Sequence, residues 1–353
     1  MKSVFFKTGL ILVLAVFIAQ ACSSGKSKGK DDQSVTFIRN DAEKRIDVLV
    51  GGIPFTSYCW PDNVFKPILY PVLSAEGTEV TRGFPLKPRE GERNDHIHQV
   101  GIWLNYGNVN GIDFWGNGHR GIKEPEGGEI KHLSFGKISE GKGEGIIETR
   151  ANWLDPKGMV LLAEETDYHF LAKGSLRIID RITKLTAING KVEMKDTKEG
   201  MFGIRVAREL ELPSDEELLL LDSSGQLSAE KVPNRGATGN YRSSEGVTGN
   251  AVWSTRAQWM LLYGNIGDEK ISIVICDHPD NPCYPTYWHA RGYGLFSANP
   301  LGWSDFTGGK EMLNFSIPDG ESVTFRYRVI IGSGSYLSDE EITSLATDFS
   351  EKY

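Results

Sequence analysis

Alternation of polar and apolar residues with a period of two dominates the chain from Val35 onward, and it limits the fold more than any other feature. Arg45–Val50 alternates cleanly until two glycines stop it, and Val160–Leu171 is a long extended candidate. In Ser175–Leu185 the alternation slips once, at Ile179, which indicates a possible β-bulge. Further strand candidates are Gly145–Ala151, Met201–Ala207, Ile271–Cys276 and Val323–Ile331. Because a strand with one apolar face has to bury it against another layer, the pattern predicts an all-β fold, an antiparallel β-sandwich.

One helix is expected, at the C-terminus. Ser338 and Glu341 form a capping box, and Ile342, Leu345 and Phe349 fall on one helical face. The 40 glycines and 15 prolines punctuate the rest of the chain at short intervals, which favours many short elements. No repeat of about 20 to 50 residues is visible, which weighs against a propeller. With no Pro/Ser-rich break after residue 35, residues 35–353 are expected to form a single domain.

The first 21 residues have the proportions of a lipoprotein signal peptide. Lys2 and Lys7 supply positive charge, Leu10–Ile18 is continuously apolar, and a small residue precedes Cys22. The expected product is anchored to a membrane through an acylated Cys22, with residues 22–34 as a flexible polar tether. The expected location is the cell envelope, at the outer membrane or the periplasmic face. A plain secretory signal with an incidental cysteine is the alternative.

Charge and cysteine usage narrow the partners. The formal net charge is −8, from 39 Lys and Arg against 47 Asp and Glu, so no nucleic-acid partner is expected. An exported chain meets an oxidising compartment, where Cys276 and Cys283 could form a disulfide across the turn between them. The alternative is that Cys59, Cys276 and Cys283 are all small buried apolar residues.

Two of the seven histidines, His96 and His98, lie close together in the first chemically unusual segment. If this segment is extended, both project from the same face. Two imidazoles so close can bind a metal jointly, hold a carboxylate or a sugar hydroxyl, or divide acid and base roles. A metal needs a third and usually a fourth ligand, so the metal stays unknown. The alternative is one histidine in the core and the other in solvent, while His132 and His169 fit ordinary strand patterns and are expected to be structural.

A glycine-rich aromatic loop, Gly111–His119, follows that segment. Trp115 either stacks on the apolar face of a sugar or fills the core, and Asp113 could accept hydrogen bonds from hydroxyls. Arg205 is a lesser candidate, because it interrupts an apolar strand. It meets either a ligand or forms a buried ion pair with Glu199 or Glu209.

The stretch from residue 277 to residue 300 gathers an unusual number of hydrogen-bond donors and aromatic rings. His289 and Arg291 share a face if their part of the chain is extended, and arginine suits bidentate contact with a carboxylate. The candidate site residues in this stretch are Asp277, His278, Trp288, His289, Arg291 and Asn299. The alternative is a rigid Pro-rich corner whose polar side chains satisfy loop backbone.

Six motifs occur together and in order over Ile46–Gly332, and with them the chain resembles the bacterial PmoA-like domain family. The motifs are Pro67–Leu73, Asp95–His98, Gly111–Trp115, Gly200–Ala207, Asp277–Pro282 and Trp288–Gly294. The resemblance implies an all-β fold similar to the galactose-mutarotase-like supersandwich, in bacteria that degrade saccharides. The family's frequent label, methane oxygenase, does not suit this chain, because the membrane methane monooxygenase subunit is a multi-helix membrane protein. The resemblance assigns no catalytic residue.

The first functional hypothesis is a protein that acts on a sugar or glycoside by acid–base chemistry. The expected catalytic residues are His96, His98 and His289. Arg291 and Arg205 would neutralise developing negative charge or hold a uronate. The other expected substrate contacts are His278, Asp277, Asn299, Trp115 and Trp288. The expected partner is a small molecule or an oligosaccharide, and the cofactor stays unknown.

Two other hypotheses remain open. One is a non-catalytic carbohydrate-binding protein that uses the same Trp and Arg residues. The other is a metal-dependent oxidoreductase, as the family label suggests, with His96, His98 and a distant histidine or carboxylate as ligands.

Overall fold

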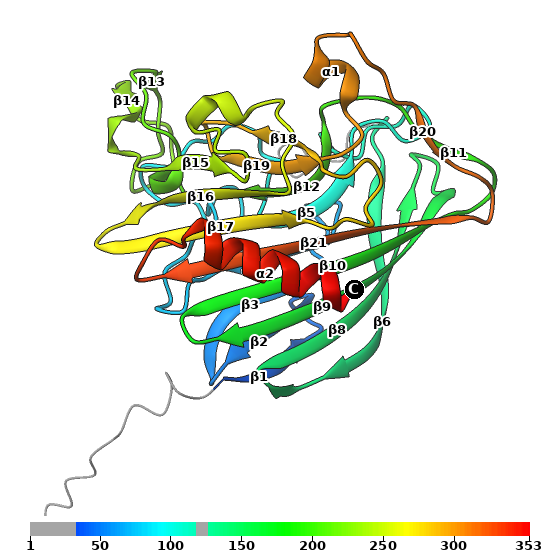
Figure 1. Ribbon diagram of the computed structural model, residues 1–353, viewed down its shortest axis with the longest axis horizontal. Coiled ribbons are helices and arrows are strands. Elements are labelled where there is room, and N and C mark those ends of the chain that lie inside the picture. The colour runs from blue at the N-terminus through cyan, green and yellow to red at the C-terminus, as the bar shows by residue number, and fades with distance from the viewer. Residues whose placement is uncertain (1–32, 118–125) are drawn as a thin grey trace, which may run out of the picture.

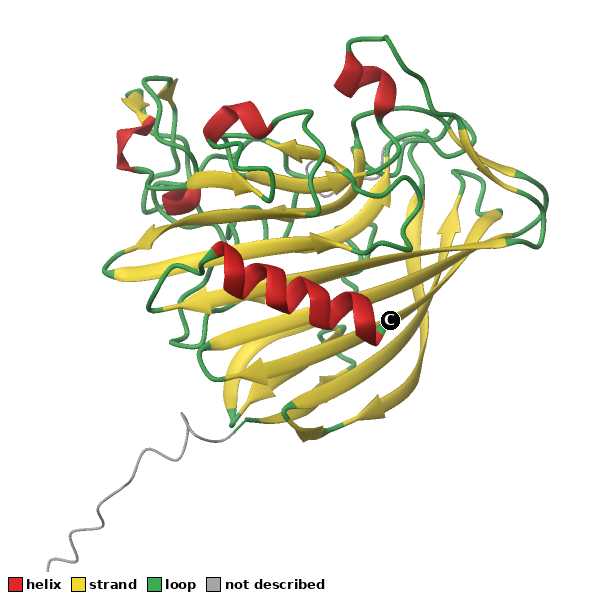
Figure 2. Cartoon of the chain, in the orientation of Figure 1, coloured by secondary structure: helices red, strands yellow, loops and turns green. Residues whose placement is uncertain are grey.

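Two large antiparallel sheets form the body of the protein in the computed structural model, which describes residues 33–117 and 126–353 (Figures 1 and 2). In spatial order, the nine-stranded sheet contains β18 (Tyr287–Ala290), β19 (Leu295–Asn299), β12 (Gly200–Arg205), β5 (Ile102–Tyr106), β4 (Ile68–Val72), β3 (Ile53–Cys59), β2 (Arg45–Val50), β1 (Ser34–Asn40) and β7 (Gly141–Lys142). The eight-stranded sheet contains β15 (Asn240–Ser243), β16 (Trp259–Ile266), β17 (Glu269–Asp277), β21 (Ser322–Ser333), β10 (Leu176–Ala187), β9 (Val160–Lys173), β8 (Glu144–Leu154) and β6 (Glu129–Ser139).

The remaining elements are short, apart from the C-terminal helix. The small strand pairs are β11 (Val192–Met194) with β20 (Phe315–Ile317), and β13 (Glu217–Leu218) with β14 (Val232–Pro233). The α-helices are α1 (Trp303–Thr307) and α2 (Asp339–Lys352), and the single-turn 3-10 segments are Arg208–Leu210, Asn234–Gly236 and Gly249–Val252. Within the described residues, neither α-helix has the length and apolarity needed to span a bilayer.

The main core lies between the two sheets. Ile102 and Leu104 of β5 and Phe202 and Ile204 of β12 point into it from the nine-stranded sheet, each two residues apart. Ile271, Ile273 and Ile275 of β17 are among the side chains that meet them from the eight-stranded sheet. This is the period-two burial that the sequence displays. The predicted antiparallel β-sandwich is therefore confirmed.

The predicted β-bulge at Ile179 is wrong. Strand β10 keeps an uninterrupted register with both β9 and β21. Ile179 points into the main core, whereas Ile178 points outward into a second apolar cluster with Leu345 and Phe349 of α2. The alternation slips because the outer face of the sheet is also covered, so apolar residues are favoured on both sides of the strand.

The C-terminal helix forms as the sequence predicts. Ser338 caps it, with its hydroxyl accepting from the Glu341 amide while the Glu341 side chain accepts from the Ser338 amide. Ile342, Leu345 and Phe349 are buried against the outer face of the eight-stranded sheet, across which the helix lies in Figure 1. The five-residue helix α1 was not predicted, because a single turn leaves no periodicity to detect.

Cys59, Cys276 and Cys283 are free thiols, so the possible disulfide between Cys276 and Cys283 does not form. Cys276 is instead buried in the cluster beneath α2, where it packs as a small apolar residue. His132 lies in β6, where its Nδ1 is 3.0 Å from the Tyr58 hydroxyl, and His169 lies in β9, where its Nδ1 is 2.7 Å from Glu144. Both have the structural roles that were expected.

A third apolar cluster covers the outer face of the nine-stranded sheet near β5 and β12. It includes Trp103, Trp115 and Leu295. A Cβ atom on Gly203 would lie 2.7 Å from the Trp103 ring, so only glycine lets this indole lie against β12. The cluster is the apolar base on which a polar cavity rests. It lies toward the β18 edge of the sheet, and β1 and β7 lie at the other edge.

Candidate functional site

A cavity of about 610 Å³ opens on the outer face of the nine-stranded sheet, and we call it the histidine pocket. Its walls come from the loops on either side of β5, the turn before β12, and β18 with the turn that follows it. The lining residues are His96, His98, Gln99, Asp113, Trp115, Gly116, Lys198, Glu199, His289, Arg291 and Tyr293. The structure thus brings together two sequence segments nearly two hundred residues apart, and the predicted candidates His96, His98, Trp115, His289 and Arg291 share one cavity.

Strand β18 decides which side chains can reach this pocket. Trp288 and Ala290 point into the main core, so His289 between them points to the opposite face. The Nδ1 atom of His289 lies 2.8 Å from the Lys198 carbonyl oxygen. A carbonyl oxygen only accepts, so Nδ1 carries the proton and Nε2 holds the lone pair in the neutral ring.

His96 and His98 lie in a tight turn, so the expected extended conformation is wrong. The Gln99 amide donates to the His96 carbonyl oxygen at 2.9 Å, and His96 has a φ of 42°. The left-handed conformation is costly for a residue with a side chain and is found where the surroundings enforce it. The turn still brings the two rings within 5.9 Å, and the His96 ring stacks on Tyr293 at 4.8 Å.

A buried ion-pair network enforces this turn. Arg82 donates to the carbonyl oxygens of Asp95, His96 and Gln99 and to the Asp95 carboxylate. Arg205, which is fully buried, donates to Asp95 at 2.7 Å and to the Gln99 side chain at 2.6 Å. The ion pair expected for Arg205 exists, but its partner is Asp95 and not Glu199 or Glu209. The prediction that Arg205 contacts substrate is not supported by this position, because its donors are directed to the turn.

The Asp95 carboxylate joins this network to the pocket. Its Oδ2 lies 3.1 Å from Nδ1 of His96. Burial alone would raise the pKa of Asp95, but the His96 hydrogen bond and the charges of Arg205 and Arg82 together lower it. Asp95 is therefore an anion that holds the His96 ring by one nitrogen and leaves Nε2 on the other side.

The electrostatics of the pocket keep two of its imidazoles neutral. Burial lowers the pKa of His289 to about 3, and Arg291 and Lys198 add to the effect. Burial also lowers the pKa of His98 to about 2, with a further contribution from Lys66. The Lys66 ammonium donates to the His98 carbonyl oxygen at 2.6 Å, and its own pKa falls to about 7 because it is buried. A neutral imidazole with a lone pair can accept a proton, or it can accept a hydrogen bond from a hydroxyl group.

Aromatic rings lie in the wall of the pocket and directly behind it. Trp115 lies nearly parallel to His289, with 6.3 Å between ring centroids, and Trp253 meets the edge of His289 at 4.9 Å. The Asp113 carboxylate accepts from the amides of Trp115 and Gly116, which fixes the loop that carries the indole. The pocket therefore combines apolar ring faces with donors and acceptors of both charges, as small-molecule sites do.

Sequence comparison adds an independent observation on these residues. The chain belongs to a family of unknown function, DUF6807. The family model matches residues 45–347, which include every residue that lines the histidine pocket. A search of curated proteins finds no match to this DUF6807 chain. The resemblance to the PmoA-like family stays a prediction.

Solved structures similar to this DUF6807 chain have low identity to it. The α-galactosidase AgaA of Geobacillus stearothermophilus is 10% identical with a TM-score of 0.39 over 85% of this chain and 40% of its own. A glycoside hydrolase family 97 enzyme of Pseudoalteromonas sp. strain K8 is 9% identical with a TM-score of 0.32, over 88% and 36%. A putative aldose 1-epimerase of Escherichia coli K12 is 10% identical with a TM-score of 0.32, over 85% and 98%. The chain spans about two fifths of the length of the α-galactosidases it matches.

Four predicted site residues of this DUF6807 member lie away from the histidine pocket. Trp288 is in the main core and donates from its indole to the Ala257 carbonyl oxygen. Asn299 is buried, donates to the Thr197 carbonyl oxygen and accepts from the Leu301 amide. Both predictions of substrate contact are corrected, because the hydrogen bonds of these side chains are used inside the protein.

Asp277 and His278 are the other two corrections. The Asp277 carboxylate accepts from the Asn281 side chain and the Thr286 amide, and burial raises its pKa to about 7. His278 is 2% exposed, accepts from the Asp280 amide and packs edge-on against Phe349 of α2. This part of the chain is the Pro-rich structural corner that the sequence analysis gave as the alternative.

Sequence reasoning missed Lys198 and Trp253, and it gave Glu199, Gln99 and Tyr293 no role in the pocket. Lys198 and Glu199 form an ion pair of 3.0 Å at the start of β12. The available signal was a charged pair directly before a buried strand, because functional residues are frequent in the loops at strand ends. Trp253 lies next to a 3-10 turn, and no pattern marks it.

The predictions on metal binding and on lipidation stay predictions. Within residues 33–117 and 126–353, no group of three or more His, Cys, Asp or Glu side chains is arranged to hold a metal ion. The predicted lipidation site, Cys22, and the loop residue His119 lie outside the described residues.

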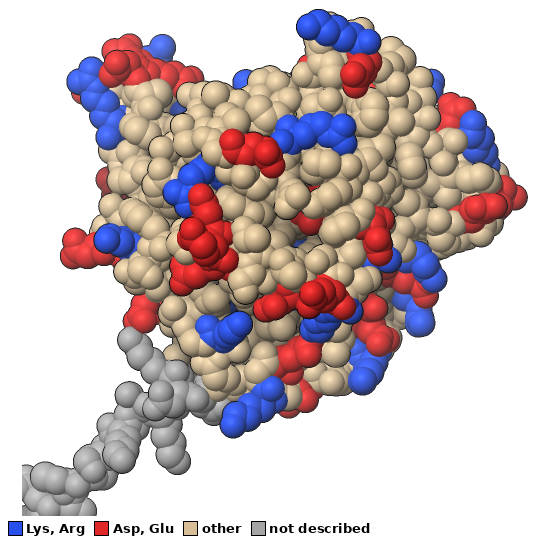
Figure 3. All heavy atoms as spheres, in the orientation of Figure 1, with Lys and Arg blue, Asp and Glu red and all other residues tan. Residues whose placement is uncertain are grey.

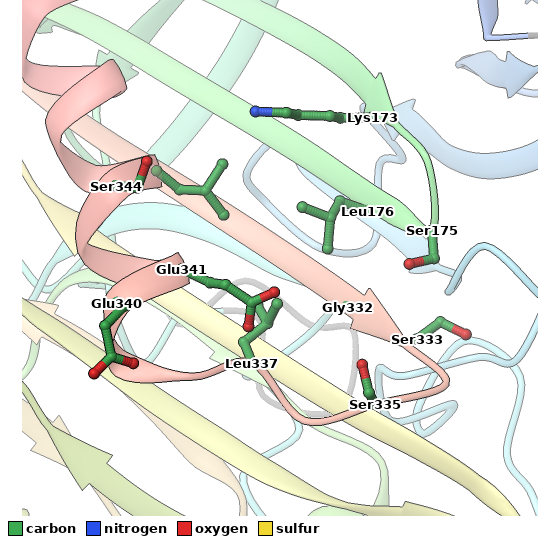
Figure 4. Close-up of a pocket in the computed structure, with 11 residues that line it drawn as sticks. Lys173, Ser175, Leu176, Gly332, Ser333, Ser335, Leu337, Glu340, Glu341 and Ser344 are labelled. Carbon is green, nitrogen blue, oxygen red and sulfur yellow. The ribbon is translucent and has the colours of Figure 1, made fainter.

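A second cavity of about 460 Å³ lies between the start of α2 and the sheet beneath it (Figure 4). Leu176, Leu337 and Leu345 line it, together with Glu341, whose carboxylate caps the helix. Acidic and basic side chains are interspersed over the face of the molecule seen in Figure 3, which is the face that carries α2. This cavity has no histidine and no arginine among its lining residues, so the histidine pocket is the better candidate for chemistry.

Proposed function

We propose that this chain binds a saccharide in the histidine pocket and transfers protons to and from the sugar's oxygen atoms. One observation carries the proposal: three imidazoles from two distant segments line a single cavity, and two of them are held neutral. A polyhydroxylated ligand needs donors and acceptors close together, and the unused Nε2 of His289 supplies an acceptor where Lys198 and Arg291 supply donors. Trp115 adds a ring for the apolar side of a sugar.

His289 is the base in this proposal. Its Nδ1–H is fixed on the Lys198 carbonyl oxygen, so the lone pair on Nε2 accepts the proton of a sugar hydroxyl. Burial lowers the pKa of the ring, so it is unprotonated at neutral pH and its Nε2 lone pair is available to a sugar hydroxyl.

His96 is the acid on the opposite wall. Its ring is the most exposed of the three, with 40% of its side chain accessible. Asp95 holds the Nδ1 side, so the ring acts as the acid from Nε2 and protonates the ring oxygen of the sugar. The bond from C1 to that oxygen breaks as His289 removes the proton of the anomeric hydroxyl and a carbonyl forms at C1. His96 loses one proton and His289 gains one, so the total number of protons on the two rings is unchanged.

The test is a saccharide panel on the full chain and two variants. Binding is measured by calorimetry, and turnover is followed by proton NMR of the anomeric region, which detects both anomeric exchange and glycosidic cleavage. The substitution His289→Gln keeps a hydrogen-bonding group but cannot serve as a base. It is expected to lower turnover roughly 100- to 10,000-fold while affinity changes only slightly. His132→Gln, at a remote structural histidine, is the matched control and should leave turnover unchanged.

The panel also separates the alternatives. Turnover that survives His289→Gln contradicts the assigned base, and a panel in which no saccharide binds contradicts the function. If wild-type protein binds without turnover and His289→Gln only weakens binding, the chain is a carbohydrate-binding protein. Stoichiometric iron, copper or zinc in gently purified protein would instead favour the metal-dependent oxidoreductase.

We also propose that Cys22 is acylated and that the chain is anchored in the cell envelope. The signal-like proportions of residues 1–21 support this proposal. Cys22→Ser should move the protein from the membrane fraction to the soluble fraction and abolish labelling by an alkyne fatty acid. Unchanged labelling of the variant would contradict the assignment.

A further inference from the structure

One arginine in the histidine pocket has a different environment from the buried arginines elsewhere in the protein. The buried guanidiniums pair with carboxylates at 2.6 to 2.9 Å, and these are Arg82, Arg205 and Arg328. The guanidinium of Arg291 instead lies over the ring of Trp253 at 4.6 Å and near that of Tyr293 at 5.8 Å. Among residues 33–117 and 126–353, no carboxylate forms an ion pair with Arg291 and no acceptor receives a hydrogen bond from its side chain.

The aromatic contacts orient this guanidinium without using its hydrogen-bond donors. Stacking occupies the face of the planar group, and its N–H bonds lie in the plane. A guanidinium stays charged at any ordinary pH, so an unpaired one in a cavity wall calls for an anion. Its parallel N–H pairs match the two oxygens of a carboxylate.

The other charges in the pocket leave room for one anion. Glu199 is neutralised by Lys198 at 3.0 Å. The Asp113 carboxylate is held by the amides of Trp115 and Gly116. Both carboxylates thus have partners inside the protein, and neither is paired with Arg291, which leaves its guanidinium to bind a ligand anion.

We propose that the saccharide bound in the histidine pocket is a uronate, whose carboxylate is held bidentately by Arg291. This inference rests on the proposed function and names its substrate class. Trp253 and Tyr293 are positioning residues in this arrangement, because they fix the plane of the guanidinium.

The test compares acidic and neutral forms of the same sugars. Calorimetry with the full chain uses oligosaccharides of galacturonate and of glucuronate, their methyl esters, their carboxyl-reduced neutral counterparts, and the corresponding sugar 6-phosphates. Wild-type protein should bind the uronates at least ten-fold more tightly than the esters or the neutral sugars. Arg291→Met should remove that preference, so that the variant binds uronates, their esters and the neutral sugars with similar affinity. Arg291→Lys, which keeps the charge but not the planar fork, should retain only part of the preference.

Arg235→Met is the matched control: Arg235 is exposed and pairs with Asp215, and the substitution removes the same charge at a residue outside the pocket lining. Melting curves of all variants verify that they are folded. Equal affinity for uronates and their esters overturns the inference, as does a preference that survives Arg291→Met. Tighter binding of the sugar phosphates overturns the choice of a carboxylate. Neutral sugars that bind without any preference for acid leave the proposed function standing, whereas a panel with no binding removes both.

Discussion

The histidine pocket and the region beneath α2 both bury charged side chains, but they use the hydrogen bonds of those side chains in opposite ways. Under α2, Arg328 sends two donors to the Asp180 carboxylate and a third to the Leu345 carbonyl oxygen. In the pocket, Arg291 contacts rings only, and His289 uses one ring nitrogen. The residue types are alike, so composition does not separate structure from function. The separating feature is whether donors and acceptors find their partners inside the protein.

The pair Asp180–Arg328 offers the strongest way to break this comparison. Asp180→Ala leaves a buried guanidinium without its counter-ion, and we expect a loss of about 3–5 kcal/mol in the free energy of unfolding. Urea denaturation measures it, and saccharide affinity of the folded variant should stay unchanged. The double variant Asp180→Ala with Arg328→Met should recover part of the loss, since no charge is then left unpaired. A loss below about 1 kcal/mol in the single variant would show that the Arg328 guanidinium does not depend on Asp180 as its partner inside the protein.

The pH dependence of stability sharpens the other side of the comparison. The pKa of His289 falls to about 3 in the folded protein, so the unfolded chain binds the proton first as pH drops below about 6.5. The contribution of this neutral ring is present above that pH and is lost as pH falls toward 3. Wild-type protein should therefore lose about 2 kcal/mol more than His289→Gln between pH 7 and pH 5. Parallel unfolding profiles of the two proteins would refute the burial of a neutral imidazole here.

Asp277 tests whether the corner near the pocket is structural. Asp277→Asn leaves one oxygen to accept from two buried donors, and we expect a loss of about 1.5 kcal/mol at pH 5 with no change in saccharide affinity. Burial raises the pKa of Asp277 to about 7, so its contribution is present at low pH and is lost as pH rises toward 7. The difference between wild type and variant should accordingly shrink at pH 8. Weaker saccharide binding by a folded variant would place Asp277 in the site after all.

The fold could be predicted from the sequence because a strand that buries one face alternates apolar and polar residues, and this alternation is visible in the sequence. Arg45–Val50 was predicted with the bounds that β2 has, and the bounds of α2 follow its capping box. The error at Ile179 arose where a distant element covers the second face. Ile178 is apolar because α2 lies over it, and no local pattern shows that a helix beginning at residue 339 will do so.

The candidate site could be predicted only as far as single segments allow. The pairing of His96 and His98 with His289 and Arg291 depended on the sheet order, in which β5, β12, β19 and β18 are neighbours. Trp288 and His289 show the limit clearly, because period two places them on opposite faces but does not say which face is the core. The prediction that Asp277 contacts substrate was wrong for another reason. Its partners Asn281 and Thr286 lie in a loop whose conformation the sequence does not fix.

Strand order in the nine-stranded sheet has a consequence for access. Strand β1 and strand β18 are seven neighbour steps apart, which corresponds to about 34 Å at roughly 4.8 Å per step. If Cys22 is acylated as proposed, the anchored end of the chain and the mouth of the cavity belong to opposite edges of this sheet.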